Sequence, residues 1–84
     1  MRLLVPAETR SGEKRVALMP GTVAKFRALG LDVSIQSGAG AGACATDADY
    51  SAAGADVVPV DRIDEALAHA DAVATVRVIV IFPG

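Results

Sequence analysis

The stretch that decides the fold is Met1-Arg-Leu-Leu-Val-Pro-Ala-Glu-Thr-Arg-Ser-Gly-Glu-Lys-Arg-Val-Ala-Leu-Met-Pro20. Its apolar run, Leu3 to Val5, predicts a short buried strand, which Pro6 ends. A charged segment follows, and Pro20 then opens a helix, because its missing N–H would be unpaired at that position anyway. A loop between a strand and a helix lies at the carboxyl end of a parallel sheet, where ligands bind in α/β folds. The charged segment is therefore the first candidate site.

Beyond this stretch, segments typical of strands alternate with segments typical of helices. Strands are expected over residues 3–5, 32–36, 55–60 and about 72–82. Helices are expected to begin at Pro20, after a Thr46 cap with Asp49 as its capping-box acid, and after an Asp61 cap, with Gly30 and Gly54 ending the first two. The side chains expected to face the sheet are Val23, Phe26 and Leu29 in the first helix, and Ile63, Leu67 and Ala70 in the third.

This alternation predicts right-handed crossovers between parallel strands. The expected fold class is α/β, a three-layer, Rossmann/flavodoxin-like arrangement around a mainly parallel sheet. Pro59 interrupts the third strand, and a proline suits an edge or a strand end. Four strands and three helices are few for a complete doubly wound domain, so we expect an incomplete one. Aromatic residues are only 4% of the chain, so the core must be built from Val, Ala, Ile and Leu, which suits a parallel sheet.

Composition and charge exclude several classes of function. The net charge of -2 and the pI near 5.1 give no reason to expect nucleic acid or an anionic membrane surface as a partner. The single cysteine, Cys44, excludes an internal disulfide and a cysteine-based zinc site, and the sequence holds no metal-ligand constellation. The N-terminus lacks the pattern of a secretory signal. The longest apolar run, Val78 to Phe82, is far too short to span a bilayer.

A glycine-rich stretch matches a loose nucleotide-binding pattern. Gly38-x-Gly40-x-x-Ala43 follows an expected strand, and an acidic residue, Asp61, lies about twenty residues further on. Three features oppose a nucleotide. The helix opens only after the glycines, it is about two turns long, and Asp47 and Asp49 in its first turn would repel a pyrophosphate. We therefore favour a plain flexible turn.

The charged segment 8–15 offers one candidate binding residue, Arg15. A guanidinium is a two-pronged partner for a carboxylate or a phosphate. The alternative, which spacing alone favours, is a structural ion pair with Glu8 or Glu13, or a solvated side chain. Arg77 lies within an apolar strand, where an unpaired charge is costly, so a structural partner is expected for it. His69 and Cys44 need no catalytic role.

The chain resembles the N-terminal domain shared by alanine dehydrogenases and the alpha subunits of proton-translocating NAD(P) transhydrogenases. The resemblance runs to about residue 77 through separate motifs in the right order. They are Val5-Pro6-x-Glu8, Gly12-Glu13-x-Arg15-Val16-Ala17-Leu18-x-Pro20, Val33-x-Ile35-x-Ser37-Gly38-Ala39-Gly40, Asp47-x-Asp49-Tyr50-x-x-Ala53-Gly54-Ala55 and Ala70-Asp71-x-Val73, with Val23 and Gly30 between them. We expect a domain over 1–77 and an atypical apolar tail over 78–84.

The resemblance implies a site shared with other parts of a larger enzyme. In alanine dehydrogenases, an arginine at the place of Arg15 holds the pyruvate carboxylate, and a lysine that polarises the keto group aligns with Thr75. Threonine cannot supply that charge, and Gly12-Glu13 is more typical of the transhydrogenase alpha branch. The catalytic histidine and the NAD-binding Rossmann domain fall beyond this chain. The expected site is therefore Arg15 as a substrate contact, with no catalytic, cofactor-binding or metal-binding residue.

The function implied is that of the N-terminal part of a transhydrogenase alpha subunit, which transfers hydride between NAD(H) and NADP(H). We expect those cofactors in the full enzyme and neither on this chain alone. The implied partners are a downstream NAD-binding domain, other transhydrogenase subunits and further copies in a homo-oligomer, without nucleic acid. The implied location is cytoplasmic and peripheral at the inner membrane. The alternatives are the N-terminal part of an NAD-dependent alanine dehydrogenase, and a non-catalytic fragment or interaction module.

Overall fold

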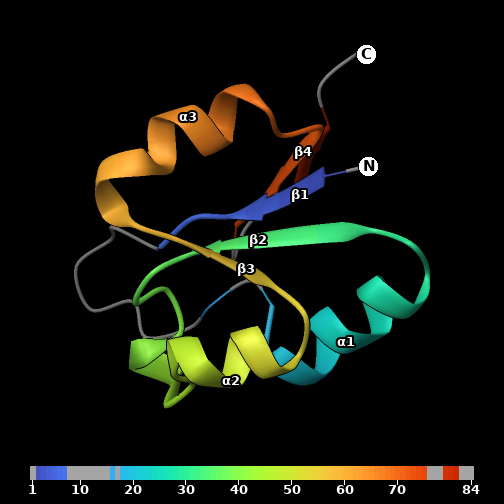
Figure 1. Ribbon diagram of the computed structural model, residues 1–84, viewed down its shortest axis with the longest axis vertical. Helices are drawn as coiled ribbons and strands as arrows, with labels where there is room; N and C mark the ends of the chain where they lie inside the picture. Colours follow the sequence, from blue (N-terminus) through green and yellow to red (C-terminus); the bar gives the residue numbers. More distant parts are fainter. Residues whose placement is uncertain (1, 8–15, 17, 76–78, 82–84) are drawn as a thin grey trace.

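The computed structural model describes residues 2–7, 16, 18–75 and 79–81, and the following statements concern these residues (Figure 1). They form one sheet with the strand order β3-β2-β1-β4-β5. The strands are β1 (Arg2–Val5), β2 (Asp32–Gln36), β3 (Asp56–Val58), β4 (Ala72–Ala74) and β5 (Ile79–Ile81). The helices are α1 (Pro20–Ala28), α2 (Asp47–Ala52) and α3 (Ile63–Ala68), with 3₁₀ turns η1 (Ala41–Ala43) and η2 (Val60–Arg62).

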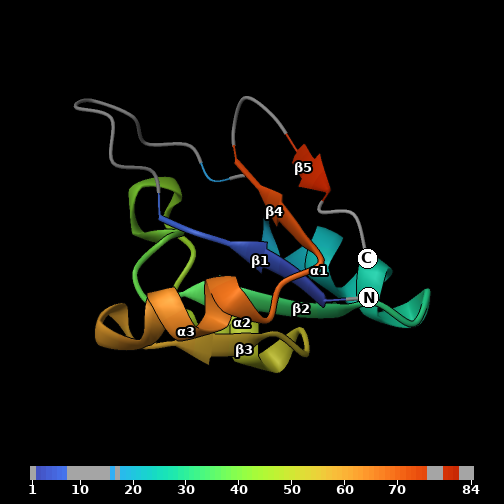
Figure 2. The same cartoon turned by 90° about the horizontal axis from the view of Figure 1, so that it is seen from above.

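The first four strands run parallel, and β5 pairs antiparallel with β4. Helices α1 and α2 cover one face of the sheet and α3 covers the other (Figures 1 and 2). The three-layer α/β fold predicted from the alternation of elements is thus confirmed. Strand β3 lies at the edge, and Pro59 follows it directly, as its proline predicted.

The hydrophobic core fills the space between the sheet and the pair α1 and α2. Alternate strand residues point into it, and the register aligns Leu3 with Val33 and Val5 with Ile35 across β1 and β2. Burial of a Val, Leu or Ile side chain stabilises the fold by about 1.5–3 kcal/mol. The buried cluster is Leu3, Val5, Leu18, Val23, Val33, Ile35, Ala39, Ala45, Tyr50, Ala55, Ala72 and Ala74. It is aliphatic apart from one tyrosine, as the composition predicted.

Helix α1 begins and ends where Pro20 and Gly30 predict. Pro20 is its first residue, the preceding Met19 has extended backbone and gives no side-chain cap, and Gly30 has a φ of +89°. Val23 is fully buried and Phe26 half-buried. The expectation that Leu29 faces the sheet is wrong, because the helix ends at Ala28 and this side chain, at the C-cap, is 77% exposed.

Helix α3 begins later than predicted. Asp61 does not cap it, since this residue lies inside the turn η2 and the N-cap position is taken by Arg62, without a side-chain cap. Half-buried residues then recur at 63, 66 and 70, the spacing of one helical face. Leu67 falls beside this face and is 45% exposed, so its predicted inward orientation is also wrong.

The single strand expected over 72–82 is instead two strands. Residues Ala72 to Ala74 form β4, and the chain returns as β5, which places Ile81 opposite Ala72. The reason is the length of the neighbouring strand, because β1 offers β4 partners only at Leu3 and Leu4. A strand of about eleven residues would extend about 36 Å and leave most of its backbone groups unpaired. Folding back supplies the missing partners.

Candidate functional site

The candidate site lies where the strand order changes direction. The chain proceeds from β1 to β2 and β3 on one side, and β4 then pairs with the other side of β1. The carboxyl ends of β1 and β4 are therefore adjacent, and they form the topological switch point, the place where open α/β sheets bind ligands. Pro6 and Ala7 follow β1 at this point, and the half-buried Thr75 follows β4.

Arg15, the predicted substrate contact, lies outside the described residues, as do its alternative partners Glu8 and Glu13 and the cation Arg77. The structure does describe both flanks of the charged segment. Ala7 and Val16 pack against the core cluster from its edge, and Leu18 is buried in it. Both described flanks of the charged segment thus pack on the hydrophobic core.

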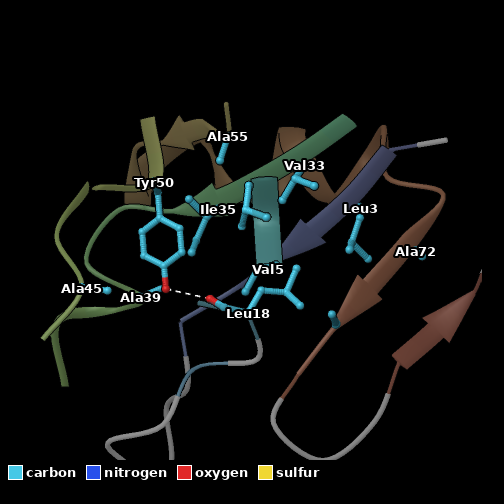
Figure 3. Close-up of a cluster of buried hydrophobic side chains, with 12 residues drawn as sticks. Leu3, Val5, Leu18, Val33, Ile35, Ala39, Ala45, Tyr50, Ala55 and Ala72 are labelled. Carbon is cyan, nitrogen blue, oxygen red and sulfur yellow. Dashed lines mark hydrogen bonds between the residues drawn. The ribbon is translucent and has the colours of Figure 1, made fainter. Parts of the chain in front are cut away.

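Two side chains hold these flanks by hydrogen bonds. The Ala7 N–H donates to Gln36 Oε1 at 2.8 Å, from the last residue of β2. The Tyr50 hydroxyl, on α2, donates to the Leu18 carbonyl oxygen at 2.7 Å (Figure 3). Sequence reasoning assigned no role to either residue. A signal existed for Tyr50, since it is the chain's single tyrosine, and a buried tyrosine hydroxyl requires a partner.

The environment of Tyr50 keeps its hydroxyl a donor. The side chain is fully buried, and burial raises the pKa of the phenol, to which the negative charge of Asp49 adds. Both effects disfavour the phenolate. The hydroxyl therefore keeps its proton, and its hydrogen bond to Leu18, throughout the neutral pH range.

Helix α2, which carries Tyr50, is fixed at its start by two carboxylates. Asp47 accepts from Ser37 Oγ at 2.6 Å and from the Gly38 N–H at 2.9 Å. These bonds, the Gly38 N–H first, lower the pKa of Asp47. Thr46 and Asp49 form the predicted capping box, with bonds of 3.1 Å and 2.9 Å in its two directions. The end of β2 and the start of α2 are thereby joined.

Most backbone N–H groups of the glycine-rich stretch already donate to acceptors of this chain. Besides Gly38, the N–H groups that donate to acceptors of this chain are those of Ala39, Ala41, Ala43, Cys44, Ala45 and Thr46. A phosphate site needs such groups free and pointing at the ligand. A hollow of about 370 Å³ does lie beside the stretch, but Asp47 lines it. This geometry opposes a nucleotide at the stretch.

The stretch is nevertheless more than the plain turn that was expected. Ala39, Gly40 and Ala45 are buried. A Cβ added to Gly40 would lie 2.5 Å from Tyr50 Cε2 and 2.8 Å from its hydroxyl oxygen. The missing side chain therefore makes room for the tyrosine ring.

Other described features offer no catalytic centre. A groove of about 530 Å³ lies under α3, and its lining mixes cations, Arg2 and Arg62, with carboxylates. His69 and Cys44 are exposed. Within the ranges that the structure describes, no three His, Cys, Asp or Glu residues gather as metal ligands, and no buried side-chain nitrogen or oxygen lacks a partner.

Comparison with known proteins places this geometry in a family. Residues 4–80 match the family model described as "Alanine dehydrogenase/PNT, N-terminal domain". The chain belongs to this family. An alanine dehydrogenase of Mycobacterium tuberculosis is 44% identical over 77 residues, which cover 92% of this chain and 20% of the relative. The first part of the NAD(P) transhydrogenase alpha subunit of Rhodospirillum rubrum is 42% identical over the same shares.

The solved structures agree with this membership. An L-alanine dehydrogenase superposes with a TM-score of 0.80 at 36% identity, over 89% of this chain and 20% of that one. This alanine dehydrogenase/PNT N-terminal domain thus spans about a fifth of the length of the relatives it matches. The predicted family is confirmed. Members of both branches, alanine dehydrogenase and transhydrogenase, are identical to this chain to almost the same degree. Among the described residues, no helix is long and apolar enough to cross a membrane.

Proposed function

We propose that the chain is the N-terminal part of a proton-translocating NAD(P) transhydrogenase alpha subunit, which transfers hydride between NAD(H) and NADP(H). The observation that carries the choice of branch is Thr75, which directly follows β4 at the switch point of the sheet. An alanine dehydrogenase requires a positive charge there to polarise a keto group, and threonine has none. The sequence Gly12-Glu13 supports the same branch.

In this proposal the chain contributes one wall of a cleft and no hydride chemistry of its own. The described residues fit a dinucleotide poorly, because most donors of the glycine-rich stretch are occupied and the Asp47 carboxylate lies beside it. NAD(H) and NADP(H) belong to the other parts of the enzyme. Arg15 is the substrate contact of this wall, where its guanidinium would hold an anionic group.

The partners in the proposal are a downstream NAD-binding domain, further transhydrogenase subunits and other copies of the chain in a homo-oligomer. The location proposed is the cytoplasm, peripheral at the inner membrane. The Rhodospirillum rubrum relative, whose name makes it one portion of a divided alpha subunit, supports an enzyme assembled from several parts. The division into a domain over 1–77 and a tail over 78–84 stays a prediction.

A second candidate is the N-terminal part of an NAD-dependent alanine dehydrogenase. Its support is the relative of that name at 44% identity, and Arg15 as a partner for the pyruvate carboxylate. A non-catalytic interaction module is the third, supported by the apolar edge strand β5, whose Ile81 is 65% exposed. Sedimentation addresses this module, because an exposed apolar edge favours association between chains.

The two enzymes are separated by joining the chain to a downstream NAD-binding domain and supplying the other transhydrogenase subunits. We expect hydride transfer from NADPH to an NAD analogue, and no oxidation of alanine with NAD. Alanine oxidation without transhydrogenation would overturn the proposal. Thr75→Lys is the informative variant, because a lysine there restores the charge that alanine dehydrogenases use.

A second measurement tests the isolated chain. Calorimetric titration with NADH is expected to show no binding, since most N–H groups of the glycine-rich stretch are already hydrogen-bonded and the Asp47 carboxylate lies beside it. Tight binding would contradict the claim that the nucleotide site lies in another part of the enzyme.

A further inference from the structure

We infer that Gln36 and Tyr50 are positioning residues, which fix the two flanks of the charged segment 8–15, and that the glycine-rich stretch serves to seat Tyr50. The inference rests on the proposed function only for what Arg15 binds. The positioning itself follows from contacts among described residues, and it gives a role to a motif that the proposed function leaves unused.

The Gln36 side chain supplies a hydrogen-bond acceptor just beyond the point where the pairing of β1 with β2 ends. The register of β1 with β2 ends at Val5 and Ile35, so the ladder offers no partner to the N–H of Ala7. The Gln36 side chain supplies one at 2.8 Å. Its oxygen must face Ala7, because the amide nitrogen has no lone pair to accept with. The backbone after Gln36 is held in turn, since the Ser37 N–H donates to the Val58 carbonyl at 2.8 Å.

Tyr50 holds the other flank. Its hydroxyl reaches the Leu18 carbonyl, which lies 32 residues away in the chain and three residues beyond Arg15. The next residue, Met19, accepts from the N–H groups of Thr22 and Val23 and so starts α1. The tyrosine therefore connects α2 to the entry of α1, at the point where the charged segment has just ended.

The glycine-rich stretch forms the seat of the tyrosine. Ala39 and Ala45 lie beside the ring in Figure 3, and both are buried. Gly40 has a φ of -91°, which any residue adopts, so the backbone conformation does not require glycine here. Space does, because a Cβ would meet the ring at 2.5 Å. The Ala45 N–H donates to the Gly40 carbonyl at 2.9 Å, which holds the two ends of the stretch that contacts the ring together.

Holding both flanks has a consequence for binding. Affinity falls when a ligand must order the chain that contacts it, and anchored flanks reduce that cost before the ligand arrives. We therefore expect positioning by Gln36 and Tyr50 to act on the binding of an anion by Arg15 through the two flanks that they hold.

Hydrogen exchange of the chain by NMR tests the anchors without any substrate. In Gln36→Leu we expect the Ala7 amide to exchange at least tenfold faster, and in Gln36→Glu we expect protection to return, because a carboxylate also accepts from Ala7. In Tyr50→Phe, which keeps the ring, we expect at least tenfold faster exchange at Thr22 and Val23. The sheet amides of β2 should change far less in each case.

Val33→Ala is the matched control, since it weakens the core at the opposite end of β2 and leaves both anchors intact. It should speed exchange in the sheet and at the flanks alike. The inference is overturned if Tyr50→Phe and Gln36→Leu behave like this control, or if they leave the flank amides unchanged. Should Tyr50→Phe not fold, Gln36→Leu with its Gln36→Glu rescue still decides the matter.

An enzyme assay separates this inference from the proposed function. In the chain joined to its downstream domain and supplied with the other subunits, Arg15→Gln tests the function, and the two anchor variants test positioning. We expect the anchor variants to raise severalfold the KM for the anionic substrate that Arg15 contacts, with little change in kcat. An unaffected Arg15→Gln enzyme would refute the role of Arg15, while the exchange result would stand on its own.

Discussion

Replacement of Gly40 by alanine tests the packing of the glycine-rich stretch most directly. The added Cβ would lie 2.5 Å from Tyr50 Cε2, 2.8 Å from the Tyr50 hydroxyl oxygen and 2.8 Å from the Ala45 carbonyl oxygen. Carbon atoms in contact prefer about 3.5–4.0 Å, so the ring or the backbone must move by about 1 Å. The Tyr50 side chain is fully buried and its hydroxyl is hydrogen-bonded to the Leu18 carbonyl, so the ring has no free space to move into.

The expected cost follows from three effects. Overpacking a core position destabilises by about 1–3 kcal/mol. Displacing the hydroxyl adds about 1 kcal/mol for the lost hydrogen bond. Against these, alanine restricts the unfolded chain and contributes about 0.4–1 kcal/mol of stability. We expect a net loss of about 2 kcal/mol, a large share of the roughly 4–13 kcal/mol that a chain of 84 residues has.

Urea denaturation measures this loss, and Gly21→Ala provides the matched control. Gly21 lies in α1, and a Cβ there would meet nothing within 4 Å. Alanine at this helical position should stabilise by about 0.5–1 kcal/mol, so the two substitutions differ in sign. A Gly40→Ala chain as stable as the wild type would refute the reasoning. In a Tyr50→Leu background the cost should largely vanish, which a double-mutant cycle measures.

Three further predictions concern the elements that hold α2 and α1. The pKa of Asp47 is lowered in the folded state, so its contribution to stability is present above the ordinary carboxyl pKa and is lost as the pH falls through the lowered one. Urea midpoints between about pH 5 and about pH 2 should therefore fall more steeply for the wild type than for Asp47→Asn. Thr46→Ala removes the capping box and should cost about 1 kcal/mol at neutral pH, which thermal denaturation followed by circular dichroism measures; an unchanged Tm would contradict the cap. Arg27→Ala breaks the ion pair between Arg27 and Asp32, whose two side chains are 42% and 59% exposed. Because both charges are exposed, the free energy of unfolding measured in urea should fall by less than about 1 kcal/mol, and by still less in high salt.

Local signals made much of the fold predictable. Pro20, Gly30 and the Thr46 capping box each act through the backbone of their own turn, so a short stretch of sequence contains the whole cause. The alternation of elements then indicated the parallel sheet, because the right-handed crossover leaves few other arrangements. These predictions needed no knowledge of distant contacts.

The predictions that were wrong depended on partners elsewhere in the chain. The strand expected over 72–82 is interrupted because β1 is too short to pair with all of it. Leu67 is exposed because α3 starts after a 3₁₀ turn, which changes the face directed at the sheet. The length of a neighbouring strand, and the point at which a helix starts after a turn, cannot be predicted from the residues of the mispredicted segment alone.

The glycine-rich stretch shows the same limit at the site. Its pattern matches a phosphate loop in spacing, yet the property that matters is whether its N–H groups are free, and sequence spacing does not contain that information. The acids Asp47 and Asp49 pointed away from a phosphate. That Gly40 makes room for a tyrosine ten residues later required the positions of both in space.

In the proposed function, the choice between the two branches of the family depends on residues at the carboxyl ends of β1 and β4, since both branches share the fold. Relatives from both branches match this chain at 44% and 42% identity, so overall identity does not separate the branches. A residue that distinguishes their chemistry must face the shared cleft, and Thr75 is the described residue that we propose for that position. A neutral side chain there removes the charge on which keto-acid chemistry depends, while a wall that only lines a hydride-transfer cleft has no need of it. In this proposal the branch is therefore decided by a few side chains at the carboxyl ends of β1 and β4, on a scaffold that both branches share.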